Sequence, residues 1–379
     1  MLQALREFRV GRPQMIAGLM LLAFMAQCFW SAKNRKISDL EYQYMLSGLA
    51  SSAEGKPILD SPFTSLMAGL PLRAINLARK IGPASWSAAL AVPRPWLLRL
   101  PFLIFGVWLG GALWWVARRL FDDEGGYVAL GLYCTSPALI KISSNIGPEI
   151  ILAWSILGLI YTAIGVAHTL FAPPKKWVPR IVILGLSIGF ALATAWWSFT
   201  LVMLAFAYML YLAPGCRRKV LVVLAGASTL GCIVLLAISR LMGSAGMGFH
   251  ALFAQKPGLD VIRNLLFPLS AKTDGYVLVL LFIAALTAYG SWPRTRYFGN
   301  TAPQTTAFAC VLLFALVPAF RIWDATLGLT FVFIFIGGIF ADLLETRLRI
   351  QVAVILAAAF LVRLVLTLHE LKGWVQNLM

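Results

Sequence analysis

The acidic residues are the first place to look for chemistry, because the chain has so few of them. Of its 379 residues, 15 are Asp or Glu and 32 are Lys or Arg. Asp39, Glu41 and Asp60 fall in one polar segment, and Glu149 follows Pro148 at the start of a later apolar run. A carboxylate at the edge of an apolar region is costly to ionise unless something balances its charge. We therefore predict that Asp39, Asp60 and Glu149 are functional and share one site.

The chemistry that such carboxylates suit is general base catalysis. A base takes the proton of an acceptor hydroxyl while the oxygen attacks another centre. Two plain alternatives stay open. Asp39 alone also fits an ordinary loop carboxylate, and Glu149 in a first helical turn complements the helix dipole after a proline that suits this position.

Several basic residues are placed to bind an anionic group. Arg240, Arg263 and Lys272 lie at the end of an apolar run and in the polar segment after it, where they suit a phosphate at headgroup level. The alternative is that these side chains reach the membrane interface and contact anionic lipids. The formal net charge of +17 comes from basic residues scattered in twos and threes between apolar runs, which excludes a nucleic-acid-binding face.

Cysteine and histidine give no sign of a metal centre. The five cysteines occur singly, and the three histidines form no HExxH or zinc-ribbon pattern. We therefore expect no metal site, and we interpret the cysteines as small buried side chains.

The composition decides which elements position these residues. Hydrophobic residues make up 60% of the chain and charged residues 12%, against about a quarter charged in soluble domains. Apolar runs long enough to cross a ~30 Å hydrocarbon layer recur throughout. We predict an all-α integral membrane protein, a single membrane domain over residues 1–379 with about eleven transmembrane helices. The predicted spans are 15–31, 97–117, 127–142, 148–171, 179–195, 197–213, 220–239, 276–290, 304–320, 325–342 and 350–368.

The distribution of basic residues predicts the orientation. Alternate connections carry two or more Lys or Arg, which is typical of the cytoplasmic side, and the other short connections carry one or none. This places the N-terminus in the cytoplasm, the C-terminus outside, and residues 32–96 and 240–275 in two long outer loops. Within the first loop, residues 63–80 predict one or two short interfacial helices rather than a span, because Pro71 interrupts them.

The order of short motifs over residues 10–215 resembles a known family. The motifs of the first outer loop are Asp39-Leu40-Glu41-Tyr42, Met45-Leu46-Ser47-Gly48 and Asp60-Ser61-Pro62. The following motifs are Leu98-Arg99-Leu100-Pro101, Arg118-Arg119-Leu120-Phe121, Ser136-Pro137, Pro148-Glu149 and Gly185 to Phe190. This series resembles the polyprenyl-phosphate-sugar-dependent glycosyltransferases of the GT-C fold, such as protein O-mannosyltransferases and lipid A aminoarabinose transferases, in a short form without a soluble C-terminal domain.

The resemblance implies an activity. It implies an inverting glycosyltransferase that moves a sugar from a polyprenyl-phosphate donor to an acceptor on the outer face of a bacterial-type cytoplasmic (inner) membrane. The resemblance makes the three carboxylates catalytic, with Asp39 as the general base and Asp60 and Glu149 orienting donor and acceptor. The expected partners are a polyprenyl-phosphate-linked sugar and membrane lipids, with partner proteins of a membrane complex and a divalent cation left open. The residues expected to bind substrate are Glu41, Tyr42, Arg99, Arg240, Arg263 and Lys272.

The sequence also departs from the family pattern. Leu40 interrupts the acidic pair, Ser61-Pro62 stands where the family has Lys-Pro-Pro, and Thr194-Ala195-Trp196 stands where it has Thr-Lys-Gly. These departures leave two other functions open. One is a non-catalytic GT-C-like subunit or scaffold of a membrane complex, and the other is a lipid or solute transporter. The scarcity of ionisable residues within the spans disfavours ion-coupled transport.

Overall fold

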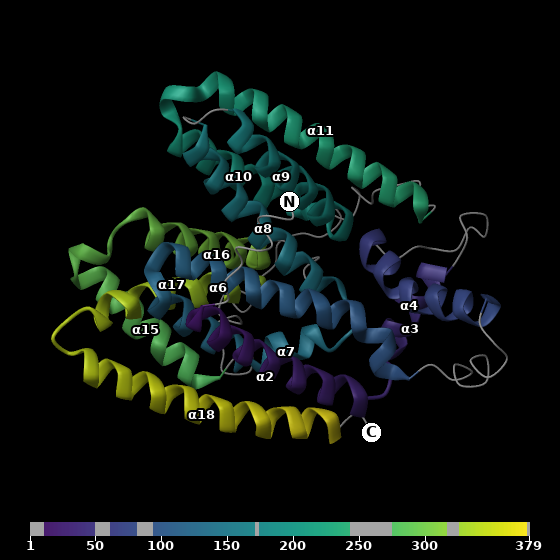
Figure 1. The fold of residues 1–379 in the computed structure, drawn as a ribbon, viewed down its shortest axis with the longest axis horizontal. Coiled ribbons are helices and arrows are strands. Elements are labelled where there is room, and N and C mark those ends of the chain that lie inside the picture. The colour runs from purple at the N-terminus through teal and green to yellow at the C-terminus, as the bar shows by residue number, and fades with distance from the viewer. Residues whose placement is uncertain are drawn as a thin grey trace.

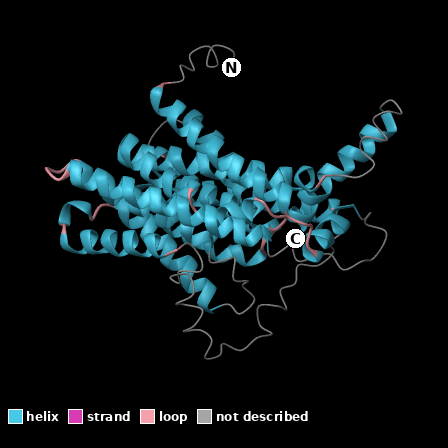
Figure 2. Cartoon of the chain, turned by 90° about the horizontal axis from the view of Figure 1, so that it is seen from below, coloured by secondary structure: helices cyan, strands magenta, loops and turns pink. Residues whose placement is uncertain are grey.

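The computed structural model of the protein describes residues 11–49, 61–81, 94–170, 174–242, 275–316 and 326–376. These residues form helices joined by short turns, and none of them lies in a strand (Figures 1 and 2). The predicted all-α fold class is therefore confirmed. The helices are α2 (Arg12–Asn34), α3 (Asp39–Leu49), α4 (Pro62–Ile81), α6 (Pro95–Cys134), α7 (Pro137–Ser143), α8 (Pro148–Thr169), α9 (Pro174–Thr194), α10 (Phe199–Leu212), α11 (Arg217–Leu241), α15 (Tyr276–Ser291), α16 (Phe298–Leu316), α17 (Thr326–Leu344) and α18 (Arg349–Gln376).

The helices match the length that a membrane requires. Among the described residues, six helices are long and apolar enough to span a bilayer, and three shorter apolar helices accompany them. The chain is a multi-pass membrane protein. The longest helix, α6, is two helices joined at a kink, where Phe121 has φ −140° and Asp122 has φ 60°. This kink lies in the connection that the sequence predicted between the spans 97–117 and 127–142.

The predicted span over residues 127–142 is wrong as one continuous helix. The helix ends at Cys134, and the short helix α7 begins at Pro137. Proline has no N–H to donate and keeps the residue before it out of the helical region. Ser136 is extended and its hydroxyl accepts a hydrogen bond from the Leu139 N–H, so Ser136 caps the new helix.

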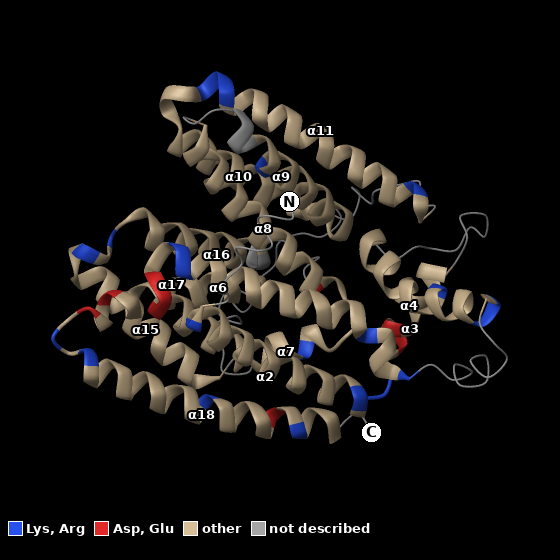
Figure 3. Ribbon diagram, viewed as in Figure 1, with Lys and Arg blue, Asp and Glu red and all other residues tan. Residues whose placement is uncertain are grey.

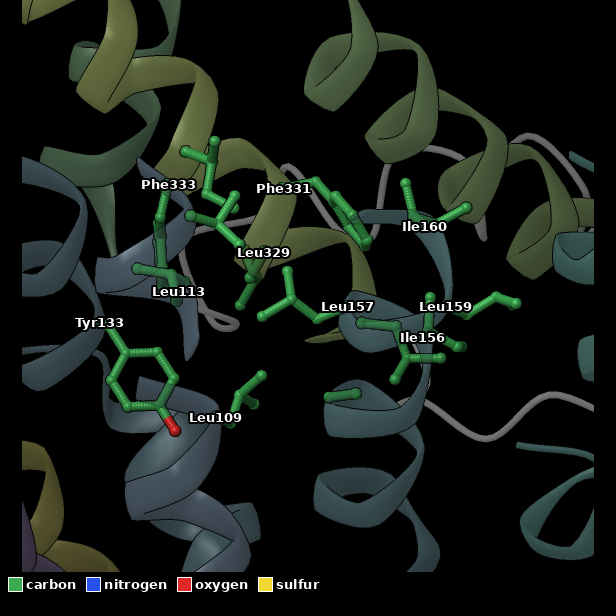
Figure 4. Close-up of a cluster of buried hydrophobic side chains, with 14 of the residues drawn as sticks. Leu109, Leu113, Tyr133, Ile156, Leu157, Leu159, Ile160, Leu329, Phe331 and Phe333 are labelled. Carbon is green, nitrogen blue, oxygen red and sulfur yellow. The ribbon is translucent and has the colours of Figure 1, made fainter. Parts of the chain in front are cut away.

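The core of the bundle is built by α6, α8 and α17. Figure 4 shows their side chains interlocking, with Leu109 and Leu113 from α6, Leu157 from α8, and Phe331 and Phe333 from α17. Helix α17 is mostly buried, whereas α2 and α18 expose most of their apolar residues at the periphery. Large apolar side chains on the outside of a helical bundle are the arrangement expected of lipid-facing helices.

The cysteines follow this division between core and periphery only in part. Cys28, Cys134 and Cys310 are buried, as predicted, and Cys216 is partly buried. The prediction is wrong for Cys232, which is exposed on α11. A thiol is apolar enough to lie either in the core or on the outer face of a membrane helix. The residue type alone therefore does not predict which cysteines are buried.

Charged residues gather at the two ends of the bundle, and the middle of each long helix is largely free of them (Figure 3). Helices α3 and α4 lie together at one of these ends (Figure 1). They cross at Gly48 and Gly69, where a Cβ on Gly69 would lie 2.5 Å from the Gly48 carbonyl oxygen. The predicted interruption at Pro71 is wrong, since α4 continues through it. The packing of α4 against α3 and α6 supports the helix across the missing hydrogen bond.

Candidate functional site

The start of α3 is fixed by a reciprocal cap between Ser38 and Glu41. The Glu41 N–H donates to the Ser38 hydroxyl at 3.3 Å, and the Ser38 N–H donates to Glu41 Oε2 at 2.9 Å. This is the capping-box arrangement of a Ser followed three residues later by Glu. It turns the Glu41 carboxylate back toward the helix N-terminus and into the protein, where Glu41 is fully buried.

Arg99 meets this carboxylate from the first turns of α6. Its Nε and Nη2 donate to Glu41 Oε1 and Oε2, both at 2.8 Å, which makes a bidentate ion pair. Its remaining N–H groups donate to the carbonyl oxygens of Ala32, Arg35 and Lys36 at 2.8–2.9 Å. All five guanidinium donors of Arg99 are therefore used within the protein.

Arg35 extends this pair to the segment that precedes α8. Its Nη2 donates to Glu41 Oε1 at 2.9 Å and to Asn145 Oδ1 at 2.5 Å, and the Ile146 N–H donates to Glu41 Oε1 at 3.1 Å. Burial acts to raise the pKa of Glu41, but the hydrogen bonds and charge of Arg99, together with the charge of Arg35, outweigh it and hold that pKa below its ordinary value. We call Arg35, Glu41 and Arg99 the buried ion cluster.

The structure gives Glu41 and Arg99 hydrogen-bond partners within the protein. Both were expected to bind substrate, but the Glu41 carboxylate already accepts five hydrogen bonds and Arg99 has no donor left. The geometry favours a positioning role over substrate contact. The spacing Ser38-x-x-Glu41 is a capping-box signal that could have predicted the start of α3, but it does not indicate that the carboxylate is buried. No sequence pattern of this kind indicates that Arg35 and Asn145 join the same hydrogen-bond network.

Glu149 lies in the first turn of α8 and is 6% exposed. Its carboxylate folds back over Gly147, close enough that a Cβ on Gly147 would collide with Oε2. Gly147 therefore allows the side chain to lie along the helix start. The buried ion cluster holds Asn145 and Ile146, only a few residues earlier, so the segment between α2 and α3 and the start of α8 meet at this cluster. That Asp39 and Glu149 share one site stays a prediction.

The other predicted site residues have different surroundings. Asp39 lies in the first turn of α3 and is exposed, and Tyr42 on the same helix is 56% exposed. Arg240 is exposed in the last turn of α11. The three remaining predicted residues lie outside the described residues; they are Asp60, Arg263 and Lys272.

An apolar groove of about 550 Å³ lies between α4 and the first half of α6. Its lining includes Leu70, Ile75, Leu100, Ile104 and Trp108, and it is almost free of polar atoms. Arg99 lies next to Leu100 in the sequence, so the groove and the buried ion cluster share the same turns of α6.

An aromatic cluster adjoins the groove and ties α4 to the neighbouring helices. Phe63 stacks on Phe190 with ring centroids 4.7 Å apart, and Phe105 packs edge-on against Trp154 at 5.3 Å. Among the described residues, no group of three or more His, Cys, Asp or Glu side chains is arranged to hold a metal ion.

The sequence matches the family described as dolichyl-phosphate-mannose-protein mannosyltransferase over residues 84–242. No curated protein matches the chain. ArnT from Cupriavidus metallidurans matches with a TM-score of 0.62 in its apo state and 0.61 when bound to undecaprenyl phosphate, at 14% and 15% identity. These matches cover 88% and 85% of this chain and 60% and 59% of the ArnT chain.

The Archaeoglobus fulgidus oligosaccharyltransferase in its apo form matches with a TM-score of 0.57 at 13% identity, over 95% of this chain and 56% of that chain. This chain thus spans between a half and two thirds of the length of these structures. At such low identity the likeness shows the fold. The chain has the fold of the GT-C glycosyltransferases, as the order of its motifs predicted.

Proposed function

We propose that this protein is a membrane glycosyltransferase that moves a sugar from a polyprenyl-phosphate donor to an acceptor on the outer face of the cytoplasmic membrane. One observation carries the proposal. The buried ion cluster joins the acidic first outer loop to the segment before Glu149, beside an apolar groove. The fold shared with ArnT, one structure of which contains undecaprenyl phosphate, supports the choice of donor.

The proposed reaction is a single displacement with inversion. The Asp39 carboxylate removes the proton from an acceptor hydroxyl, and that oxygen attacks the anomeric carbon from the face opposite the lipid phosphate. The bond between the anomeric carbon and the phosphate oxygen breaks as the new glycosidic bond forms, and polyprenyl phosphate leaves with both electrons. Asp60 and Glu149 orient donor and acceptor in this scheme.

The donor has an apolar part and an anionic part, and the two need different surroundings. The isoprenoid chain suits the groove between α4 and α6, whose volume falls in the 300–1,000 Å³ range typical of ligand pockets. The phosphate suits cations at headgroup level, for which we propose Arg240, Arg263 and Lys272. Tyr42, exposed on α3 near Asp39, remains a candidate for contact with the sugar.

Glu41 and Arg99 enter this proposal as positioning residues. Their ion pair fixes the first turn of α3, which carries Asp39, and the Ile146 N–H ties the start of α8 to the same carboxylate. Reacting groups placed to within about an ångström contribute much of an enzyme's rate. A buried ion pair between the first turns of α3 and α6 provides such a constraint.

The test uses the purified protein in nanodiscs with undecaprenyl phosphate and a panel of polyprenyl-phosphate sugars. Asp39→Asn should cut single-turnover transfer by about 10²–10⁴-fold and leave donor affinity nearly unchanged, because it removes only the base. Arg240→Ala should instead weaken donor binding. Asp123→Asn, at the kink of α6 and away from the groove, is the matched control and should change neither.

Full transfer activity in Asp39→Asn would remove that residue from the catalytic role. A wild-type protein that binds undecaprenyl phosphate but transfers no sugar from any donor would favour the non-catalytic subunit. Failure to bind the lipid phosphate at all would overturn the proposed function.

A further inference from the structure

The C-terminal end of α18 lies against Arg35 of the buried ion cluster, although more than 300 residues separate Arg35 from Trp374 in the sequence. The Arg35 guanidinium lies over the Trp374 ring, 4.5 Å from its centroid, and the Lys141 ammonium lies 5.7 Å from the same centroid. Lys141 also pairs with Glu370 one turn earlier on α18. Figure 1 shows this end of α18 beside the end of α2, and α18 also contacts α7.

The last turns of α18 are packed more tightly against the protein than the rest of this helix. Most of the helix exposes its apolar side chains, but Leu371 and Val375 in its last turns are nearly fully buried. Halfway along, Thr367 and Arg363 donate to carbonyl oxygens at the break between α6 and α7. The inward face of α18 thus follows α7 up to the level of the buried ion cluster.

The charge balance of the cluster explains why an aromatic ring is needed there. Two guanidinium groups, Arg35 and Arg99, share one carboxylate, and Arg99 takes both of its oxygens. Arg35 has a side chain only 5% exposed, so water cannot complete its solvation. The face of an indole ring attracts a cation, and the attraction is largest where the cation is desolvated.

Arg35 also holds the segment that leads into α8, through its hydrogen bond to Asn145. A change that releases Arg35 toward water would therefore free Asn145 and, a few residues later, the turn that carries Glu149. The ion pair between Lys141 and Glu370 holds the same segment, because Lys141 lies on α7 just before it.

We propose that Glu370 and Trp374 form a C-terminal latch that holds Arg35 and Lys141 and so positions the two loops of the outer site. Trp374 and Glu370 are positioning residues, since they act through Arg35 and Lys141. The role given to Glu149 rests on the proposed function, but the latch itself does not.

The experiment measures hydrogen–deuterium exchange of the full chain in nanodiscs, which needs no substrate. Trp374→Ala should speed exchange about 2- to 30-fold in peptides covering residues 36–41 and 144–149, the range expected for loss of a cation–π contact. These peptides contain the Ser38 and Ile146 amides that donate to Glu41. Trp374→Phe keeps an aromatic face and should restore exchange to near the wild-type rate.

Trp115→Ala is the matched control, because Trp115 also holds an arginine over its ring but lies near the kink of α6, at the other end of that half of the helix from Arg99. Unchanged exchange in Trp374→Ala, equal acceleration in Trp374→Phe, or the same acceleration in Trp115→Ala would overturn the proposal. If Trp374→Ala does not fold, the same exchange measurement is made on Glu370→Gln. Faster exchange in the peptide covering residues 144–149 would support the proposal, and unchanged exchange would refute it. An unmodified protein that fails to bind undecaprenyl phosphate would refute the proposed function and leave the latch standing.

Discussion

Replacement of Glu41 by glutamine is the sharpest test of the buried ion cluster, because it removes one charge and almost no volume. The carboxylate accepts hydrogen bonds from Arg35, Arg99 (twice), Ser38 and Ile146, at distances of 2.8–3.1 Å. The substitution puts an NH₂ group in place of one carboxylate oxygen, and that group then points at donors instead of accepting from them. Two buried guanidinium groups are left without an anion.

The size of the effect follows from burial. The side chains of Glu41 and Arg99 are 1% and 0% exposed, so water cannot replace the lost partner. Hydrogen bonds to a charged group contribute about 1.5–3 kcal/mol each, and adding five of them would overcount, because they share one carboxylate. Removal of one partner of a buried pair costs about 3–5 kcal/mol. We expect Glu41→Gln to lower the free energy of unfolding by that amount, roughly two to four orders of magnitude in the folded-to-unfolded ratio.

The assay is reversible unfolding of the purified protein in mixed micelles, with Asp123→Asn as the control. Asp123 pairs with Arg118, but both side chains are at least 33% exposed, so the control should lose less than about 1 kcal/mol. A Glu41→Gln loss as small as that of the control would refute the reasoning, since it would mean that the cluster is hydrated or open.

The pH dependence gives an independent check on the same group. The pKa of Glu41 lies below its ordinary 4.5 in the folded state, so its stabilisation is complete above that value and is lost as the pH falls through the folded pKa. A protonated Glu41 side chain resembles glutamine. The stability difference between wild type and Glu41→Gln should therefore be constant near neutral pH and narrow below pH 4.5. A difference that widens with acidification would contradict this assignment.

Local geometry and topology give three further predictions. Gly147→Ala should rotate the Glu149 carboxylate away and reduce sugar transfer in a single-turnover assay. It should lower the free energy of unfolding by less than about 1 kcal/mol, because only the end of a flexible side chain must move. Gly48→Ala should cost about 1–3 kcal/mol in the same unfolding assay, since its Cβ meets backbone of α4 that cannot yield. A cysteine at Ser52 should react with an impermeant thiol reagent in intact cells and one at Thr346 should not, and the opposite labelling would reverse the predicted orientation.

The membrane architecture could be predicted because hydrocarbon imposes it locally. Each apolar run must satisfy its own backbone hydrogen bonds, so length and composition alone predict a helix. The kink at Asp122 also had a local signal, in the charged turn after Arg118-Arg119. The break before Pro137 was missed because the apolar run continues across it, and only the backbone chemistry of proline separates the two helices.

The sequence by itself determined that this chain is helical, crosses the membrane repeatedly and places its scarce carboxylates near the ends of apolar runs. Only the tertiary structure decided which carboxylate is buried. Asp39 and Glu41 are near neighbours with the same side-chain chemistry, but Asp39 is exposed while Glu41 is enclosed by Arg35 and Arg99. The physical reason is that a buried charge needs hydrogen-bond and ion-pair partners in place of water. Here those partners come from segments far apart in the sequence, such as Ile146, which donates to Glu41, and Trp374, whose ring lies against Arg35.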